Sequence, residues 1–368
     1  MAVRLTPESA DVERLCAEAS AHLEAGQFAE TYELLTRART LAPESPLVHY
    51  RLALYYSDKG QLREALAAID ISLRLDGANP KAHNNRGSAL EQLGRLAEAE
   101  IAFRRALEFG PELAPPYINL GHLLEQRGAT AQAVEIYERA IARGLDREMF
   151  QQYRAAVSGQ NTRASPESWV RATFDNFAPA FDARLHTLGY KVPQELAKRL
   201  LSRTSGPLDI LDLGCGTGQC GLALAKHKAS LTGVDLSEKM LQQAGRLGIY
   251  DQLHVAEVHA FLRARAGQCY DAVISADVFI YIGALEDVFR ETARVLRPGG
   301  WFAFSTEEQH NQDFVLLPTG RYAQSQEYIQ RLASSEFDNL IADPALIRLE
   351  NGTPLMGRLY LLQKHSSK

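Results

Sequence analysis

Cysteine is scarce in this sequence of 368 residues, which contains only Cys16, Cys215, Cys220 and Cys269. No two of them form a CxxC pair, and no group of histidines accompanies them at metal-ligand spacing. This pattern argues against a cysteine-ligated zinc site and against a disulfide framework. We therefore expect inert, reduced thiols and no bound metal.

Long apolar segments and basic clusters are missing as well. The apolar runs fall short of the ~20 residues that a membrane-spanning helix needs, and the first residues do not form a signal peptide. Forty Lys and Arg stand against 45 Asp and Glu, and there is no run of four or more basic residues. We therefore expect a cytoplasmic protein with neither a membrane nor a nucleic acid as its partner.

The first half of the chain contains an internal repeat. Glycines recur at intervals of 34 residues, at Gly26, Gly60, Gly94 and Gly128. Small residues lie seven positions before these glycines, and large apolar or aromatic residues lie nine positions after them. The small residues are Ala19, Ala53, Gly87 and Gly121, and the large ones are Leu35, Ile69, Phe103 and Tyr137. Helix pairs joined at a glycine turn and packed closely at small residues explain this pattern.

The repeated pattern resembles the tetratricopeptide repeat. Four units are expected at about residues 12–45, 46–79, 80–113 and 114–147, within a domain of residues 1–154. The resemblance implies a concave groove that binds a peptide or protein, although a passive packing element is the alternative. Asn84, Asn85, Asn119 and Arg51 fall on the first helices of their units, where groove side chains lie, but solvated surface explains each of them equally well.

Residues 155–168 are polar, contain Gly159 and Pro166, and are expected to link this domain to a second one at residues 169–368. Strands then alternate with helices, which predicts a parallel sheet whose ligands bind at the carboxyl ends of the strands. The expected strands are Leu208–Leu213, Ser230–Leu236, Gln252–Glu257, Tyr270–Ala276 and Gly300–Ser305, the last after a turn at Arg297–Gly300. The expected helices include Glu238–Leu247 and Leu285–Leu296.

A glycine-rich segment, residues 212–218 (DLGCGTG), follows the first expected strand. Glycines there allow a sharp turn and a close approach of the backbone to a ligand. Asp235 ends the second strand, where a carboxylate can accept both ribose hydroxyls. Ser237 is the better cap for the next helix, so we expect Asp235 to be free for the ribose. Glu257 closes the third strand, where an acid can bond an adenine amino group.

These motifs, together with YDAVISADVFIYI (270–282) and LRPGGWFAFS (296–305), resemble the class I methyltransferases in order and spacing. Two further strands, Leu340–Leu349 and Pro354–Gln363, are joined around Asn351-Gly352, a strong hairpin signal. That family's sheet ends in such an antiparallel hairpin. Three segments, FDNFAPAFDARLHTLGYKVP (174–193), YIG (281–283) and GRYAQSQEYIQRL (320–332), resemble more narrowly the bacterial group of predicted methyltransferases that carry tetratricopeptide repeats. There is one departure: Gln324 stands where histidine is usual in that group.

The resemblance implies S-adenosylmethionine as the cofactor and assigns residues to each part of it. The glycine-rich segment would surround its amino-acid part, the ends of the second and third strands would hold the ribose and adenine, and residues after the fourth strand would face the sulfonium. The residues so implied are Asp212, Gly214, Cys215, Gly216, Gly218, Asp235, Leu236, Met240, Glu257, Val258, Asp277 and Val278. Phe174, Phe181 and Tyr190 would form a lid, or else plain core.

The acceptor of the methyl group is less constrained. Candidate substrate residues are Tyr281, Glu307, Arg321, Tyr322 and Arg348. Arg321 and Arg348 could clamp a carboxylate, and surface ion pairs are the alternative for both. A [DN]PP[YF] segment, a Pro-Cys dipeptide and an Asp-Asp-Asn metal set are missing, which disfavours exocyclic base amines, cytosine rings and catechols bound through magnesium. The remaining acceptors are a small carboxylate, hydroxyl or amine, or a peptide side chain. The competing hypothesis is an interaction scaffold that binds the cofactor without catalysis.

Overall fold

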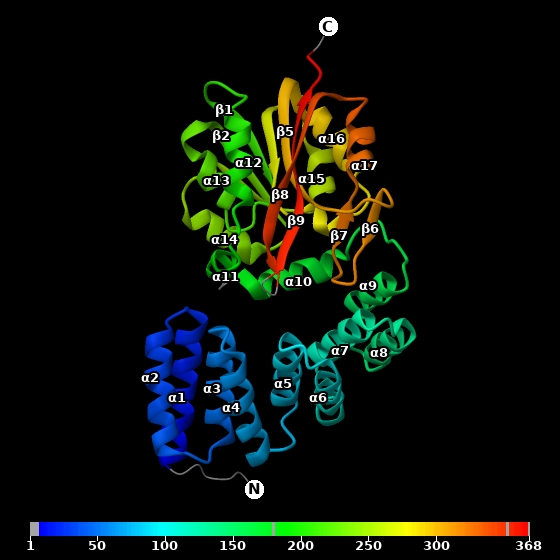
Figure 1. Cartoon of the computed structure of the whole chain (residues 1–368). Coiled ribbons are helices and arrows are strands. Elements are labelled where there is room, and N and C mark those ends of the chain that lie inside the picture. Colours follow the sequence, from blue (N-terminus) through cyan, green and yellow to red (C-terminus); the bar gives the residue numbers. More distant parts are fainter. Residues whose placement is uncertain (1–6, 179–180, 351–352, 367–368) are drawn as a thin grey trace. The chain divides into compact units, whose positions relative to one another are not determined.

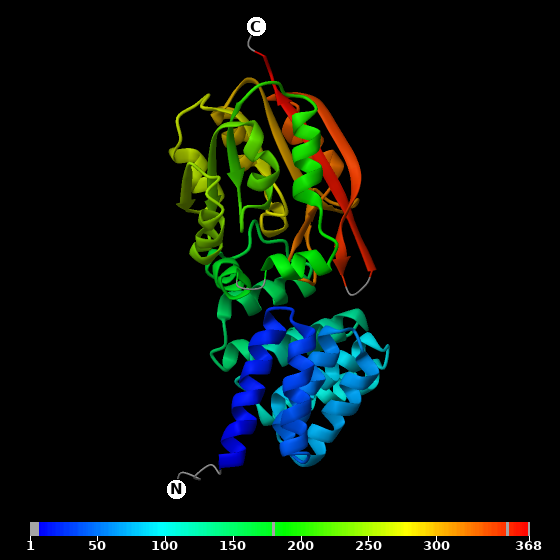
Figure 2. The same cartoon turned by 90° about the vertical axis from the view of Figure 1, so that its left-hand side faces the viewer.

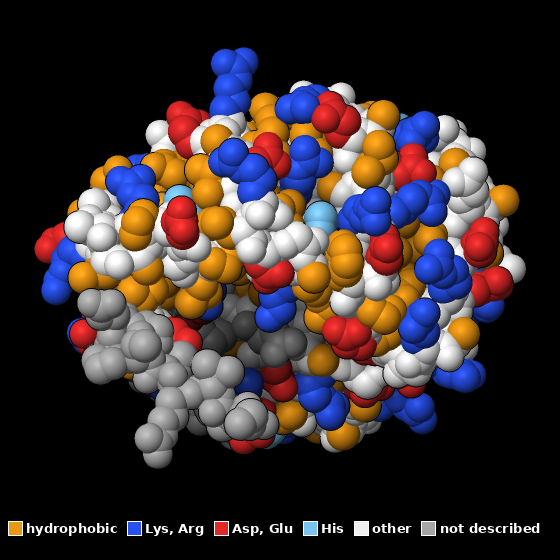
Figure 3. Space-filling model, turned by 90° about the horizontal axis from the view of Figure 1, so that it is seen from below, with side chains coloured by type: hydrophobic (Ala, Val, Ile, Leu, Met, Phe, Trp, Pro, Cys, Tyr) orange, Lys and Arg blue, Asp and Glu red, His pale blue; other side chains and the backbone are white. Residues whose placement is uncertain are grey.

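The computed structural model describes residues 7–178, 181–350 and 353–366. The chain divides into two compact units, Met1–Val157 and Ser158–Lys368. Among the described residues, no helix combines the length and the apolar character needed to cross a bilayer. On the face of the molecule seen in Figure 3, acidic and basic side chains intermingle with hydrophobic ones rather than segregate by sign.

The first unit consists of antiparallel helix pairs that follow the predicted period (Figures 1 and 2). The pairs are α1 (Pro7–Glu24) with α2 (Phe28–Leu41), α3 (Pro46–Asp58) with α4 (Leu62–Leu75), α5 (Pro80–Gln92) with α6 (Leu96–Phe109), and α7 (Ala114–Gln126) with α8 (Thr130–Ala142). A ninth helix, α9 (Arg147–Val157), covers the last pair through Phe150, which packs on Tyr117 and Tyr137. The helical-repeat prediction is confirmed.

Two glycine positions explain why the repeat has this period. Gly128, which separates α7 from α8, has φ +74°, a left-handed conformation that disfavours any residue with a Cβ. Gly121 lies against the buried ring of Tyr137, and a side chain at Gly121 would overlap that ring. A small residue on the first helix therefore makes room for a large one on the second, and Gly87 leaves room for Phe103 in the same way.

The second unit is a sheet covered by helices on both faces, as predicted (Figures 1 and 2). Its strands are β1 (Leu208–Leu213), β2 (Lys228–Asp235), β3 (Gln252–Val255), β4 (Tyr270–Ser275), β5 (Leu296–Glu308), β6 (Phe314–Leu316), β7 (Tyr322–Gln324), β8 (Phe337–Glu350) and β9 (Thr353–Lys364). The order is β3-β2-β1-β4-β5-β7-β6, with β9 antiparallel to β5 and β8 antiparallel to β9. Strands β1 to β5 are parallel.

Side chains that alternate along the strands pack into two separate cores, because successive residues of a strand point to opposite faces of the sheet. Ile210 packs with the core that includes α12 (Val192–Leu201) and α13 (Gln219–Leu224). Its neighbour Leu211 packs with the core of the other face. That second core contains residues of α15 (Val258–Ala264), α16 (Glu286–Val295) and α17 (Gln326–Ala333). The remaining helices are α10 (Glu167–Phe177), α11 (Phe181–Thr187) and α14 (Glu238–Arg246), with the short 3-10 helices η2 (Ala225–His227) and η3 (Phe279–Tyr281).

Two details differ from the sequence-based expectation, and a third lies partly outside the described residues. The turn expected at Arg297–Gly300 is a bulge within the longer strand β5, because Tyr270 pairs with Leu296 while Ala272 pairs with Trp301. The short strands β6 and β7 were not predicted, since three residues are too few to show a period. The two strands of the terminal hairpin are confirmed, whereas its expected turn, Asn351-Gly352, lies outside the described residues.

Candidate functional site

A cavity of about 570 Å³ lies in the second unit, at the carboxyl ends of β1, β2 and β4. Its volume falls within the range of small-molecule sites, ~300–1,000 Å³. Four segments that follow strands supply much of its wall, as a doubly wound sheet requires. These segments contribute Gly214, Cys215, Gly216 and Thr217 after β1, Asp235 and Leu236 at the end of β2, Ala256 to His259 after β3, and Ala276, Asp277, Val278, Ile280, Tyr281 and Ile282 after β4.

Most of the predicted cofactor residues line this cavity, but three do not. The residues on the wall are Gly214, Cys215, Gly216, Asp235, Leu236, Glu257, Val258, Asp277, Val278 and Tyr190. Asp212, Gly218 and Met240 are absent from the described lining residues. Asp212 and Met240 are buried, at 1% and 0% exposure, so they act from behind the wall.

The glycine-rich segment turns sharply after β1. A side chain at Gly214 would overlap Val278, because the loop passes close to the segment after β4. At Gly216, which has φ +53°, an added Cβ would meet no atom within 4 Å. The space beside Gly216 is therefore open to the cavity, and a ligand can approach the backbone directly there.

Asp235 is bound by two backbone groups rather than left free. The Gly216 N–H donates to its Oδ2 at 2.9 Å, and the Ser237 N–H donates to its Oδ1 at 2.8 Å. Ser237 caps α14 by accepting from the Met240 N–H at 3.1 Å, as expected. Burial raises the pKa of Asp235, and these N–H donors oppose the rise. Each carboxylate oxygen has a second lone pair, so the side chain keeps capacity for a hydroxyl donor.

Glu257 does not close the third strand, which ends at Val255. It is the N-cap of α15, where its carboxylate accepts from the His259 N–H at 2.9 Å and from the Ala260 N–H at 2.6 Å. The strand is shorter than expected because its neighbour β2 ends at Asp235, the residue that pairs with Val255. Glu257 is therefore both the N-cap of α15 and part of the cavity wall.

Asp277 is the residue under the greatest backbone strain at this site. Its φ of +56° is uncommon for a residue with a Cβ, and such outliers concentrate at functional sites. Ser305 holds it by accepting from its N–H at 2.9 Å and donating to its Oδ1 at 3.0 Å. Burial raises the pKa of Asp277, and the Arg348 guanidinium, whose Nη1 donates to its Oδ2 at 3.3 Å, opposes that rise.

Arg348 forms a buried ion pair, so the alternative of a surface pair was wrong for it. The residue is 7% exposed, and its Nη2 bonds Glu307, which is 2% exposed. Arg348 also lines the cavity, so its expected role in clamping a carboxylate stays a prediction. Arg321 lines the cavity, and its Nε lies 3.6 Å from Glu307 Oε1. Glu307 itself is not among the described lining residues.

The site fits the cofactor that the sequence predicted, on three structural grounds. The cavity has room for it, the backbone at Gly216 is open to it, and carboxylates stand at the ends of β2 and β4. Residues 211–304 match the family model described as a methyltransferase domain, and residues 50–114 and 114–143 match tetratricopeptide-repeat models. The second unit carries a class I methyltransferase domain. S-adenosylmethionine is the cofactor of this domain.

Curated relatives match only part of this chain. The ubiquinone biosynthesis O-methyltransferase of Bordetella avium is 34% identical over 143 residues, which are 38% of this chain and 55% of that protein. The biotin biosynthesis bifunctional protein of Saccharophagus degradans is 31% identical over 140 residues, or 37% of this chain and 24% of that protein. The chain thus spans about half the length of the ubiquinone enzymes that it matches first. Among solved structures, magnesium protoporphyrin IX methyltransferase of Synechocystis with bound S-adenosylmethionine covers 56% of this chain and 100% of its own at 18% identity, with a TM-score of 0.41.

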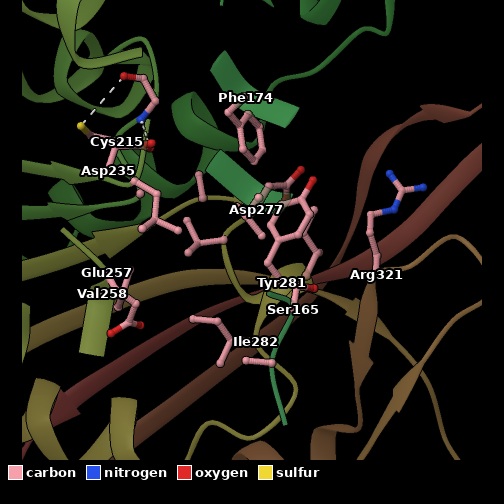
Figure 4. Close-up of a pocket in the computed structure, with 18 of the residues that line it drawn as sticks. Ser165, Phe174, Cys215, Asp235, Glu257, Val258, Asp277, Tyr281, Ile282 and Arg321 are labelled. Atoms are coloured by element: carbon pink, nitrogen blue, oxygen red, sulfur yellow. Dashed lines mark hydrogen bonds between the residues drawn. The ribbon is translucent and has the colours of Figure 1, made fainter. Parts of the chain in front are cut away.

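Aromatic side chains form part of the wall of the methyltransferase cavity. Phe174 meets Phe181 at 6.0 Å and Tyr281 at 5.4 Å between ring centroids, both edge to face. In Figure 4, Cys215 and Asp235 lie at one side of the drawn residues and Arg321 at the other, with Asp277 and Tyr281 between them. Burial raises the pKa of Tyr281 to about 12, so this phenol is a hydrogen-bond donor at neutral pH and not a base.

Part of the expected linker is built into this wall, which the sequence did not reveal. Helix α9 continues to Val157, and α10 begins at Glu167. Between them, Asn161 donates to the Phe314 carbonyl at 3.0 Å and accepts from the Leu316 N–H at 2.9 Å. Ala164 forms an antiparallel bridge with Ile282, and Arg163, Ala164 and Ser165 line the cavity. A polar, glycine-containing segment gives no local signal of such pairing.

Tyr322 and Gln324 are buried behind the cavity wall rather than on it. Tyr322 bonds Thr162, and both residues are outside the described lining set. Gln324 donates from its side-chain nitrogen to the carbonyls of Phe279 and Ile282, at 2.9 Å each. Gln324 therefore anchors the segment that carries Tyr281. The glutamine at this position, where histidine is usual, helps to set the conformation of that segment.

Proposed function

We propose that this protein transfers a methyl group from S-adenosylmethionine to an acceptor held in the aromatic half of the cavity. The observation that carries the proposal is the meeting of the open backbone at Gly216, the Asp235 carboxylate and the aromatic wall around one cavity. The bound cofactor supplies an electrophilic methyl group. The protein's contribution is to align donor and acceptor and to exclude water.

Each part of the cavity has a proposed role. Gly214, Cys215 and Gly216 hold the amino-acid part of the cofactor, and Asp235 with Leu236 holds the ribose. Glu257 and Val258 face the adenine, and Asp277 with Val278 faces the sulfonium. Phe174, Phe181 and Tyr190 cover the site. Arg321, Tyr281 and Arg348, which all line the cavity, face the acceptor.

The acceptor is proposed to be a small molecule methylated on oxygen. The aromatic wall of Phe174, Phe181 and Tyr281 suits a small, largely apolar molecule. The similarity to O-methyltransferases of ubiquinone biosynthesis favours an oxygen over a nitrogen. Nitrogen or carboxyl methylation of a peptide is the alternative within the same chemistry.

Calorimetric titration with S-adenosylmethionine tests the cofactor half. Asp235→Ala should weaken binding about tenfold or more, because a buried charged acceptor is worth ~1.5–3 kcal/mol. Asp209→Ala is the matched control, since Asp209 lies at the amino end of β1 and bonds Ser230 and Arg297 instead. Equal affinity of the two variants would overturn the assignment of the site.

Transfer of the labelled methyl group to a small-molecule extract tests the chemistry itself. A labelled neutral product that is lost in Asp235→Ala is expected. Tight cofactor binding without any labelled product would favour the alternative of a scaffold that only binds the cofactor.

We further propose that the repeats dock a peptide or protein partner. The first helices of three successive units, α3, α5 and α7, carry a hydrogen-bonded polar row. In it, Asn119 donates to Asn84 at 3.0 Å, Asn84 to Asn85 at 3.4 Å, and Asn85 to the Tyr50 hydroxyl at 3.2 Å. Such amides can pair with a peptide backbone. Co-purification of the full chain and of its Asn84→Leu, Asn119→Leu variant tests this role, and identical captured proteins would argue against it.

A further inference from the structure

Tyr250 occupies the space behind the glycine-rich segment. It lies in the connection between α14 and β3, and its ring meets Gly218 before α13, Gly221 within α13 and Gly233 on β2. An added Cβ would lie 3.1 Å from its Cε2 at Gly218 and 2.9 Å from its Cδ1 at Gly233, and would overlap its hydroxyl at Gly221. The ring therefore fills the room beside Gly221 and shares the room beside Gly218 with Leu247 and the room beside Gly233 with Leu253 and Cys215.

The same tyrosine bonds the acid that precedes the glycines. Its hydroxyl donates to Asp212 Oδ2 at 2.7 Å, and Asp212 is 1% exposed. Burial raises the pKa of Asp212 to about 7. The titratable groups that face it are the Tyr250 hydroxyl, the carboxylate of Asp235 on β2 and the thiols of Cys215 and Cys220, and the like charge of Asp235 adds to the rise.

We propose that Tyr250 is a positioning residue for the cofactor: it supports the glycine-rich segment from behind and keeps Asp212 hydrogen-bonded there. Neither residue lines the cavity among the described residues, so both act through the backbone of the segment that does. The inference rests on the proposed cofactor function. It assigns a role to a side chain that no sequence motif marked.

The test is titration with S-adenosylhomocysteine at pH 6 and at pH 9. Tyr250→Phe keeps the ring and removes the donor, and the loss should cost most when Asp212 is ionised, because hydrogen bonds to charged groups are stronger than those to neutral ones. We expect affinity within about threefold of the wild type at pH 6 and about tenfold weaker at pH 9, as loss of a hydrogen bond to a charged group predicts. A purely structural role would lower affinity equally at both pH values.

Gly221→Ala gives a second, independent measurement. Its methyl group would displace the Tyr250 hydroxyl from Asp212, so it should weaken binding in the wild-type background. The added Cβ would also lie 2.6 Å from the ring Cζ and 3.0 Å from Cε2, so the background that relieves it is Tyr250→Leu, which lacks the ring, and there the added effect should be within about twofold. Additive effects of the two substitutions would overturn the proposal.

Tyr360→Phe is the control, because Tyr360 is a buried tyrosine that lies on β9 and stacks on Phe304, outside the glycine-rich segment. It should bind S-adenosylhomocysteine as the wild type does. Affinity of Tyr250→Phe within twofold of the wild type at both pH values would overturn the inference and leave the proposed function intact. Absence of binding by the wild type would overturn both.

Discussion

The two units bury different kinds of polar side chain. In the repeats, the buried polar side chains of the described residues are Thr31, His49, Ser72 and Gln152, and none is an acid, a lysine or an arginine. In the methyltransferase domain, Asp212, Glu307 and Arg348 are buried near the ends of the strands. Buried charges cost free energy unless they are paired, and here they gather around the cavity. The repeat core is therefore built for packing, whereas the second unit accepts an electrostatic cost where it binds its ligand.

Breaking the buried ion pair should show this contrast most strongly. Arg348→Leu leaves Glu307 and Asp277 without their guanidinium, and we expect the free energy of unfolding of the second unit to fall by ~3–5 kcal/mol. Denaturant titration measures it.

The control is Arg86→Leu in the repeats. It removes a pair with Asp70 at 2.8 Å whose side chains are 26% and 48% exposed, so the loss should be about 1 kcal/mol or less. Equal losses at the two sites would contradict the comparison.

Titration of Asp212 should make the stability of the second unit fall with rising pH. Its folded-state pKa, about 7, lies above the ordinary value near 3.9. Its contribution is therefore fully present below about pH 4, is lost as pH rises through about 7, and is constant above. Relative to Asp212→Asn, the wild type should lose up to about 4 kcal/mol of unfolding free energy across that window.

The control is Asp251→Asn, because Asp251 should make stability depend on pH in the opposite direction. The bonds from Lys228 and the Leu231 N–H lower the pKa of Asp251, so its stabilisation is present above its unfolded pKa and lost as pH falls through the folded value. Parallel stability curves for the wild type and Asp212→Asn would exclude a perturbed Asp212.

Glycine should matter for packing in one unit and for binding in the other. Gly121→Ala overlaps the Tyr137 ring, and we expect a loss of ~1–3 kcal/mol with cofactor affinity unchanged. Gly216→Ala meets no atom within 4 Å, so only its left-handed backbone should cost stability, about 1 kcal/mol. Its methyl group points into the cavity and should weaken S-adenosylmethionine binding about tenfold. Thermal unfolding and calorimetry separate the two outcomes, and reversed effects would contradict the comparison.

Local sequence was sufficient for most of the fold. The glycines at intervals of 34 residues predicted the helix pairs, because turn geometry and small-to-large packing are local properties. Strands β1 and β4 were predicted nearly to the residue, since buried parallel strands are short apolar runs. Strands β6 and β7 were missed because they exist only through pairing with β5 and with each other.

The sequence by itself determined that helical repeats precede a methyltransferase domain, and that the cavity lies where Gly216, Asp235 and Asp277 follow their strands. Only the tertiary structure decided how those acids are used. Asp235 is held by the loop, Glu257 caps a helix, and Arg348 reaches Glu307 and Asp277 from 41 and 71 residues away. Asn161 and Tyr250 reach the site in the same way, across 155 and 38 residues. Hydrogen bonds over such separations depend on how the strands assemble, so no local pattern of residues could have predicted them.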